Sequence, residues 1–418
     1  MLRILNFFRR EWAYLCEVSV DQRRLLGGAF LYGVATPVVY VFSNTYLWRQ
    51  SADPIVLALF NTGFFGGLWF GFLGNGLLLR RFASPRLYFL GCLLQGLVPI
   101  TLVTLHAKAD SVALLLGLVL GVAGGFYWGN RNYLTSELTV GPRRLKFISL
   151  ESTATLLAAV LSPVITGWLL VLGERTGWYT TQSAYQVAAG FAFVVLIVAG
   201  LLVAHITHVL PPLEHLRIHS RRGRWNQLRL LEVFNGFVDG LEGAIPLVIL
   251  LTFVGLEHAI GTIDSLAAIL ASLGLYLIGK WARHDHHINL LRLWVVFTFL
   301  GRALFSLLYS TAGALVFYTV EGFVGGFRWN SMVSVVYETI DREQDGQASA
   351  RRYAYLTDRE LFLNAGRVSA LLLFIVLYAN APEFTIRYGL LLGLAAQIPL
   401  LVLAKKQIRP RAQLDSPL

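Results

Sequence analysis

The chain is poor in charged residues, cysteine and methionine for its length. Only 14% of its 418 residues are charged, against about 25% in an average soluble protein, and it has two cysteines and two methionines. Cys16 and Cys92 are too few for a disulfide framework and lack the spacing of metal ligands. No Walker sequence, nucleophile elbow or HExxH helix occurs, so neither direct ATP drive nor hydrolysis is indicated. We expect a protein that is not an enzyme and holds neither a cofactor nor a metal.

Hydrophobic residues make up 56% of the chain, and the mean hydropathy is +0.61. About 20 apolar residues suffice to cross a bilayer as a helix, and we count twelve such segments, from 24–47 to 385–404. The predicted fold class is therefore an all-α integral membrane protein with twelve transmembrane helices. No unbroken apolar core typical of a cleavable signal occurs in 1–23, whose apolar spacing predicts a cytoplasmic, interfacial helix.

The distribution of basic residues predicts the orientation of these spans. If the N-terminus is cytoplasmic, 27 of the 35 lysines and arginines fall in cytoplasmic connections and only four in the outer loops. Cytoplasmic loops carry an excess of Lys and Arg, so both termini are predicted to be cytoplasmic. A basic, polar connection that begins near Pro211 divides the spans six and six. The predicted parts are a cytoplasmic segment 1–23, a bundle 24–207, a linker 208–227, a bundle 228–406 and a tail 407–418.

The two halves also resemble each other in sequence. Gly124-Gly125-Phe126 in the fourth span matches Gly325-Gly326-Phe327 in the tenth, and Ala35-Thr36-Pro37 in the first matches Ala244-Ile245-Pro246 in the seventh. Four matches occur in the same order with an offset of 201 to 209 residues. This register predicts two pseudo-symmetric six-helix repeats, with a solute site near the membrane midplane where they meet.

At this level the chain resembles the major facilitator superfamily. The pattern of that family after its second helix, Gly-x-x-x-Asp-Arg-x-Gly, is matched at Gly76 and Arg81. Arg80 replaces the aspartate, so the role attached to that aspartate does not carry over. Ser162-Pro163, followed by Gly167, is a relaxed match to the pattern of the family's exporters. The resemblance implies secondary active transport by alternating access, with the first, fourth, seventh and tenth helices lining the cavity, and it favours export.

Acidic residues inside spans are the main candidates for a functional site. Asp239 and Glu242 share one face of the seventh span, and Glu321 lies in the tenth. An ionised group near a span centre costs roughly 2.5–3.5 kcal/mol, and such residues usually serve function. Acids at close range cannot all stay ionised, so we predict that these three couple transport to protons. The alternative is that arginines of neighbouring helices neutralise them and that they hold the bundle together.

Further intramembrane residues are predicted to bind solute or to close a gate. Solute contact is predicted for an arginine and three aromatic residues of the fourth and tenth spans: Arg328, Tyr127, Trp128 and Trp329. Arg302 is predicted to pair with one of the acids, and Arg131 to seal an inner gate with Glu360 or Glu137. The remaining gate or structural candidates are Glu151, Glu360, Asn364 and Arg367, the last three on one stripe of the eleventh span.

The sequence thus favours a proton-coupled secondary transporter for a small organic solute, with membrane lipids around it and no nucleic-acid partner. We expect a monomer in the inner membrane of a bacterium. A lipid flippase of the same fold is an alternative, for which apolar lateral faces would serve. A membrane-embedded sensor or enzyme is the alternative of a different class.

Overall fold

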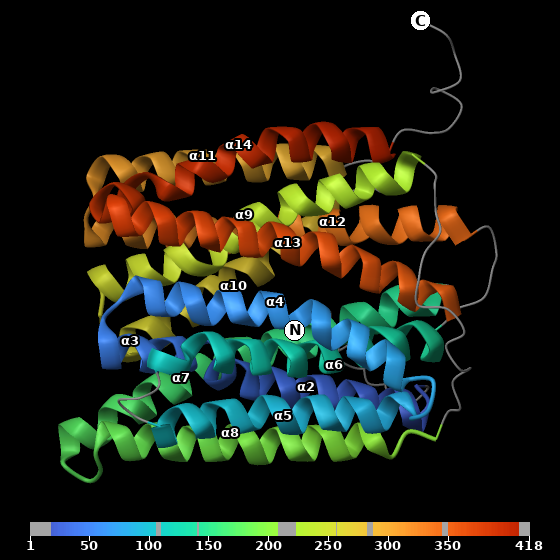
Figure 1. The fold of residues 1–418 in the computed structure, drawn as a ribbon, viewed down its shortest axis with the longest axis horizontal. Helices are drawn as coiled ribbons and strands as arrows, with labels where there is room; N and C mark the ends of the chain where they lie inside the picture. Colours follow the sequence, from blue (N-terminus) through green and yellow to red (C-terminus); the bar gives the residue numbers. More distant parts are fainter. Residues whose placement is uncertain are drawn as a thin grey trace, which may run out of the picture.

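Long helices running side by side form the whole architecture (Figure 1). The computed structural model describes residues 18–105, 110–139, 142–207, 223–255, 257–281, 287–344 and 350–408. Within these ranges every regular element is helical. The predicted interfacial helix before residue 18, most of the linker 208–227 and the tail after residue 408 lie outside the described residues.

The first half contains six helical rods, of which the first is interrupted. Its elements are α2 (Val20–Pro37), η1 (Val38–Phe42), α3 (Ser43–Ser51), α4 (Pro54–Leu78), α5 (Ser84–Leu105), η3 (Asp110–Val112), α6 (Ala113–Leu138), α7 (Pro142–Thr176) and α8 (Thr181–Ala204). Local sequence explains the starts: Ser19 and Gln22 form a capping box before α2, and Asp53 caps α4 with Pro54 in its first turn.

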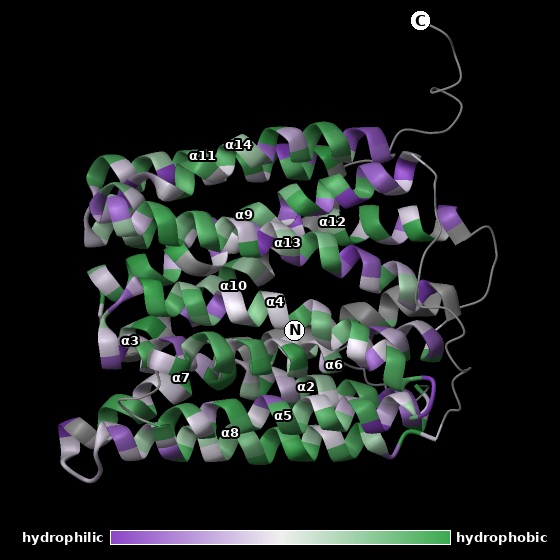
Figure 2. Ribbon diagram, in the orientation of Figure 1, coloured by the Kyte–Doolittle hydropathy of each residue, from purple (hydrophilic) through white to green (hydrophobic). Residues whose placement is uncertain are grey.

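The second half repeats this plan with six further helices. They are α9 (Gly223–Phe253), α10 (Glu257–Trp281), α11 (His287–Leu308), α12 (Thr311–Gln344), α13 (Ala350–Asn380) and α14 (Pro382–Ile408). Figure 2 shows hydrophobic residues along the length of most helices and hydrophilic ones gathered towards their ends. Large apolar side chains such as Phe191 in α8 and Phe299 in α11 are exposed, as expected for surfaces that face lipid.

Nine helices among the described residues are long and apolar enough to cross a membrane, counting α2, η1 and α3 as one. The helices α7, α10 and α12 are not in this set, and the described parts of α7 and α10 contain shorter apolar stretches at Val160–Gly173 and Ala259–Ser272. The all-helical membrane fold is therefore confirmed. The full number of twelve spans and the cytoplasmic termini stay predictions.

Helix packing repeats between the halves, as the sequence repeat predicts. In the first half α2 packs on α7, α4 on α6, and α5 on α8. The corresponding pairs in the second half are α9 with α13, α10 with α12, and α11 with α14. The contacts between the halves are related in the same way, because α4 meets α13 and α7 meets α10. Solute sites in repeats of this kind lie where the halves meet, so this interface positions the candidate site.

Glycines on both sides allow α4 and α6 to pack closely. A Cβ atom on Gly67 would lie 2.2 Å from the carbonyl oxygen of Leu118, and one on Gly121 would lie 2.0 Å from that of Phe64. Only glycine allows backbones to approach this closely. The repeated Gly-Gly pair of the sequence does not have one role: a Cβ on Gly125 would lie 2.6 Å from the backbone of Gly71 in α4, whereas a Cβ on Gly325 would meet no described atom within 4 Å.

Candidate functional site

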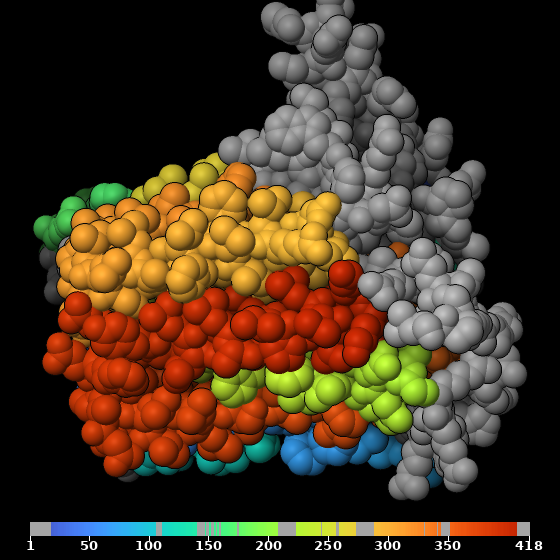
Figure 3. Space-filling view, turned by 90° about the horizontal axis from the view of Figure 1, so that it is seen from above, coloured from blue at the N-terminus to red at the C-terminus, as the bar shows by residue number. Residues whose placement is uncertain are grey.

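Two acids of α9 are held by arginines of three other helices. Asp239 and Glu242 lie three residues apart and so face the same way. Asp239 Oδ1 accepts a 2.6 Å hydrogen bond from Arg328 of α12, and its Oδ2 accepts one of 2.7 Å from Arg367 of α13. Arg328 also lies 3.1 Å from Glu242 Oε2 and donates to Asn235 at 2.9 Å. In Figure 3, α9 is visible only as a strip between α13 and α14, which cover it.

Arg302 extends this pairing into α11. Its side chain is 1% exposed and donates to Glu321 Oε1 at 2.9 Å, to the other oxygen of Glu242, and to the carbonyl oxygen of Leu390 at 3.3 Å. The order Glu321–Arg302–Glu242–Arg328–Asp239–Arg367 therefore alternates acid and base. We call these six residues the charge chain. Its formal charges cancel, which offsets much of the cost of removing them from water.

The charge chain also reaches the first half of the molecule. The guanidinium carbon of Arg367 lies 4.8 Å from the ring centroid of Phe65 in α4, within the range of a cation–π contact. Arg367 is further oriented by Asn364, whose side-chain oxygen accepts from it at 2.9 Å. A change of pairing at Asp239 would therefore alter the position of Arg367 at the α4–α13 contact between the halves.

A cavity of about 210 Å³ lies between the two halves, next to the charge chain. The residues that line it come from both halves. Those used below are Tyr40, Asn44 and Asn61 from the first half and Glu242, Asp264 and Tyr318 from the second. They belong to η1, α3 and α4 on one side and to α9, α10 and α12 on the other. Glu242 is thus both a member of the charge chain and a wall of the cavity.

A π-helical turn positions Tyr40 in this wall. Pro37 ends α2 and has no backbone N–H to donate, and the following residues Val38–Phe42 form the wider turn η1. The Tyr40 hydroxyl donates a 2.8 Å hydrogen bond to Gln95 Oε1 of α5, which also accepts one of 2.9 Å from Tyr32. The buried amide of Gln95 therefore fixes the aromatic wall on this side of the cavity.

Asp264 is a site residue that the sequence interpretation missed. It lies in the apolar stretch Ala259–Ser272 of α10 and lines the cavity beside Tyr318 and Ile260. The available signal was the same as for Asp239, namely an acid within an apolar run. Its place near the start of the predicted span, where a carboxylate reaches the membrane surface easily, concealed it.

The aromatic residues predicted to bind solute lie away from this cavity. Tyr127 stacks on Tyr32 with ring centroids 3.5 Å apart, and Trp128 meets Tyr32 edge to face at 6.1 Å. Trp329 of α12 is 51% exposed. None of Tyr127, Trp128 and Trp329 is among the residues that line the 210 Å³ cavity. Their role in solute binding stays a prediction, because in this conformation they do not line the cavity.

The predicted gate residues pair within each half. Arg131 of α6 makes a bidentate pair with Glu151 of α7 at 2.8 and 2.7 Å, and so does not bridge to Glu360 or Glu137. Glu360 instead accepts from Arg359 at 2.8 Å and from Asn364 at 3.1 Å, all along α13. These pairs link helices or turns of the same half.

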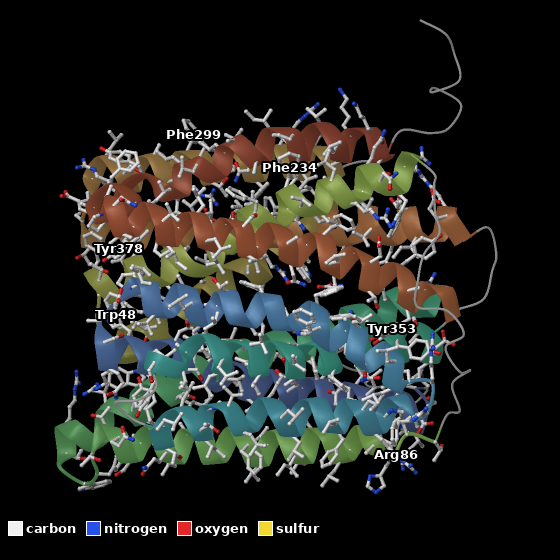
Figure 4. The ribbon with its side chains drawn as sticks, in the orientation of Figure 1. Trp48, Arg86, Phe234, Phe299, Tyr353 and Tyr378 are labelled. Atoms are coloured by element: carbon white, nitrogen blue, oxygen red, sulfur yellow. The ribbon has the colours of Figure 1, made fainter. Side chains whose placement is uncertain are left out.

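One polar contact between the halves involves a residue that the sequence did not single out. The Asn75 amide nitrogen in α4 donates to the hydroxyl of Tyr353 in α13 at 2.8 Å. Asn75 Oδ1 accepts from Asn130 of α6 at 2.6 Å, and Asn130 accepts from Ser84 at 2.8 Å. All four side chains are buried. Figure 4 shows Tyr353 near the end of α13 that approaches α4.

A second hollow and a metal site are the other candidates for a functional site. A hollow of about 690 Å³ is lined by residues of α3, α7, α8 and the turn between the last two, all from the first half, so it does not lie between the repeats. Among the described residues there is no group of three or more His, Cys, Asp or Glu side chains that would hold a metal ion.

Comparisons with known proteins agree with this architecture. A model of the family described as Major Facilitator Superfamily matches residues 25–354. The uncharacterized protein YqgE of Bacillus subtilis (strain 168) is 26% identical over 363 residues, which is 86% of this chain and 82% of that protein. An uncharacterized protein of Geobacillus stearothermophilus, from the sodM 3′ region, is 30% identical over 188 residues, 44% of this chain and 81% of that one.

Solved structures of transporters share the fold. The nucleoside transporter NupG superposes with a TM-score of 0.66 at 12% identity, covering 93% of this chain and 100% of its own. A bacterial homologue of the iron transporter ferroportin, in an inward-facing state, gives 0.67 at 16% identity, with 93% and 99% covered. The transporter FucP, in an outward conformation, gives 0.60 at 14%, also with 93% and 99% covered. At these identities the likeness concerns the fold.

Proposed function

The chain belongs to the major facilitator superfamily, and on this premise we propose that it is a proton-coupled transporter of a small organic solute. The fold of the family implies secondary transport by alternating access, in which two helical halves rock around a site between them. The finer parts of the proposal concern the location of the solute, the residue that takes the proton and the direction of transport.

The observation that carries the proposal is the double position of Glu242. Its carboxylate lines the cavity between the halves and also pairs with Arg302 and Arg328 in the charge chain. A solute in the cavity and a proton on Glu242 therefore act on the same group. This arrangement provides the differential interaction that coupling requires, because each ligand changes the free energy of binding the other.

Proton transfer at Glu242 would rearrange the charge chain. A proton on its carboxyl group removes the negative charge between two guanidinium groups and weakens both ion pairs. Arg302 would then rely on Glu321, and Arg328 on Asp239. Since Arg367 shares Asp239 and contacts Phe65 of the other half, the new pairing would shift the α4–α13 interface. Asp239 and Glu321 act in this scheme as alternative anionic partners.

We place the protein in the cytoplasmic membrane of a bacterium, since both curated relatives are bacterial, and we propose export as the direction. The exporter-like pattern at Ser162-Pro163 supports export, because this part of α7 lies at the interface between the halves. A Cβ on Gly261 of α10 would lie 2.3 Å from the carbonyl oxygen of Pro163, so this part of α7 packs directly on the other half. A lipid substrate is the second candidate, and polar walls from both halves favour a soluble solute over it.

The proposal is tested in two steps with purified full-length protein. A thermal-shift screen against metabolites, drugs and lipids finds ligands, because a compound that binds only the folded state raises the melting temperature. A stabilising solute is then followed in proteoliposomes, both by uptake driven by a pH gradient and by solute counterflow without a gradient. We expect Glu242→Gln to lose the driven uptake and to keep counterflow.

The control variant is Glu383→Gln, which removes an exposed acid in the first turn of α14. It should behave like the wild type in both assays. Driven uptake that survives in Glu242→Gln would rule out this carboxylate as the proton carrier. Stabilisation by lipids alone, together with lipid scrambling in the proteoliposomes, would replace the solute transporter by a flippase.

A further inference from the structure

The charges around the cavity do not balance. The charge chain contributes three acids and three arginines, and each of its acids has at least one arginine within 3.1 Å. Asp264 is an additional acid in the same cavity wall, and no hydrogen bond or ion pair joins it to another described side chain. An unpaired carboxylate inside a membrane protein is unfavourable. The cavity is therefore one positive charge short of neutrality.

The other walls favour an organic cation as the source of that charge. Tyr40 and Tyr318 line the cavity from opposite halves, and aromatic faces attract cations through their quadrupole. Asn44 and Asn61, which share a 2.8 Å hydrogen bond, present amide groups on the same side as Tyr40. The remaining lining is largely apolar, with Pro246, Leu247 and Leu250 among it. An anion would meet Asp264 and the two tyrosines, and the described lining residues include no base.

The size of the cavity limits the ligand further. Its volume of about 210 Å³ is below the roughly 300–1,000 Å³ of sites that hold drug-sized ligands. A compact molecule with one charged nitrogen and a small apolar body fits these limits. A bare inorganic cation would leave the aromatic and aliphatic walls without a contact.

We propose that the cavity binds a small organic monocation, with Asp264 as its counter-ion and Tyr40 and Tyr318 as its aromatic walls. The proposal rests on the transport function proposed above and specifies its substrate class. The proton acts on Glu242, as proposed above, so the two acids of the cavity have different roles.

Choline and 3,3-dimethylbutanol form a suitable probe pair, because they have nearly the same shape and differ in the positive charge. Binding of each is measured by calorimetry on the purified full-length protein. We expect choline to bind at least about tenfold more tightly than the neutral alcohol, and Asp264→Asn to remove this preference. The control Glu383→Gln should keep it. Equal binding of the two probes to the wild type would overturn the proposal.

A second pair of variants tests the aromatic wall and does not depend on the folding of Asp264→Asn. Tyr318→Phe keeps the ring and should keep the preference for choline, whereas Tyr318→Leu should reduce it severalfold. An unchanged preference in Tyr318→Leu would contradict the proposed wall.

The outcomes separate this inference from the transport proposal. A neutral or anionic solute that shows counterflow, with affinity unaffected by Asp264→Asn, would refute the cation site and leave the transporter standing. Choline binding that depends on Asp264, without counterflow of any bound solute, would support the cation site and refute transport.

Discussion

Asn75 in α4 donates a 2.8 Å hydrogen bond to the hydroxyl of Tyr353 in α13, across the interface between the two halves. The same hydroxyl donates to the backbone carbonyl of Phe72 at 2.8 Å. Both side chains are almost fully buried, at 0% and 1% exposure. Separation of the halves at this end breaks both bonds, and each such bond typically contributes about 0.5–1.5 kcal/mol net. The two bonds therefore stabilise the conformation in which α4 and α13 are in contact.

Removal of the Tyr353 hydroxyl should weaken this contact between α4 and α13. Tyr353→Phe leaves the buried Asn75 amide and the Phe72 carbonyl without their partner, at a cost of about 1–3 kcal/mol in unfolding free energy. The control is Tyr378→Phe near the other end of α13, whose hydroxyl makes no hydrogen bond to another described residue. A double-mutant cycle of Tyr353→Phe with Asn75→Ala measures the coupling. A coupling energy of zero would show that the contact does not hold the halves together.

Removal of Arg302 should destabilise the second half severely. Arg302→Met leaves Glu242 with only Arg328 and Glu321 with no basic partner, and breaking a buried pair typically costs about 3–5 kcal/mol. Arg292→Met on the same helix is the control, because Arg292 is exposed and makes one long side-chain hydrogen bond. The measurement is the melting temperature in detergent, read by monodispersity after heating.

A compensating change distinguishes a charge effect from a packing effect. Adding Glu321→Gln to Arg302→Met removes the acid that lost its partner, so the double variant should be more stable than Arg302→Met alone. If the double variant were the less stable of the two, the loss would come from the arginine's packing and not from the unpaired acid.

The glycines of the α4–α6 contact offer a matched pair of substitutions. Gly67→Ala places a Cβ 2.2 Å from the Leu118 carbonyl oxygen, so the helices must move apart, at a cost of about 1–3 kcal/mol. Gly66→Ala meets no atom within 4 Å and should raise stability by up to about 1 kcal/mol through helix propensity. Equal melting temperatures for the two variants would mean that α4 and α6 are less closely packed than described.

Asp239 should be needed for coupling and dispensable for expression. Asp239→Asn removes the anion that Arg328 and Arg367 share, so the charge chain can no longer exchange partners when a proton binds. We expect uptake driven by a pH gradient to be lost, with protein yield and solute counterflow retained, as measured beside Glu383→Gln. Driven uptake at the wild-type rate would make Asp239 a structural residue only.

The sequence allowed the acids and arginines of the site to be identified, but not their partners. Arg302 was expected to meet one acid and meets Glu242 and Glu321 together. Arg131 was expected to seal an inner gate with Glu360 or Glu137 and pairs with Glu151 within the first half. The cost of a charge in a membrane is visible in a hydropathy pattern, whereas the choice of partner depends on how each helix is rotated about its axis.

Asp264, Tyr353 and the turn that presents Tyr40 could not be found in the same way. Asp264 lies near the start of its predicted span, where a carboxylate is common, and Tyr353 is one of 17 tyrosines in the chain. Their importance arises from position alone, one in the wall of a cavity and the other against Asn75.

The sequence by itself determined that this protein is a helical membrane protein built from two related halves. Hydropathy and repeat spacing are local properties, and they survive any arrangement of the helices. Only the tertiary structure decided which charges cancel and which is left over. Asp239 meets Arg328 and Arg367 across 89 and 128 residues of sequence, and Asp264 meets no cation among the described residues. These relationships depend on the packing of whole helices, because a rotation of one helix by less than a turn would exchange every partner.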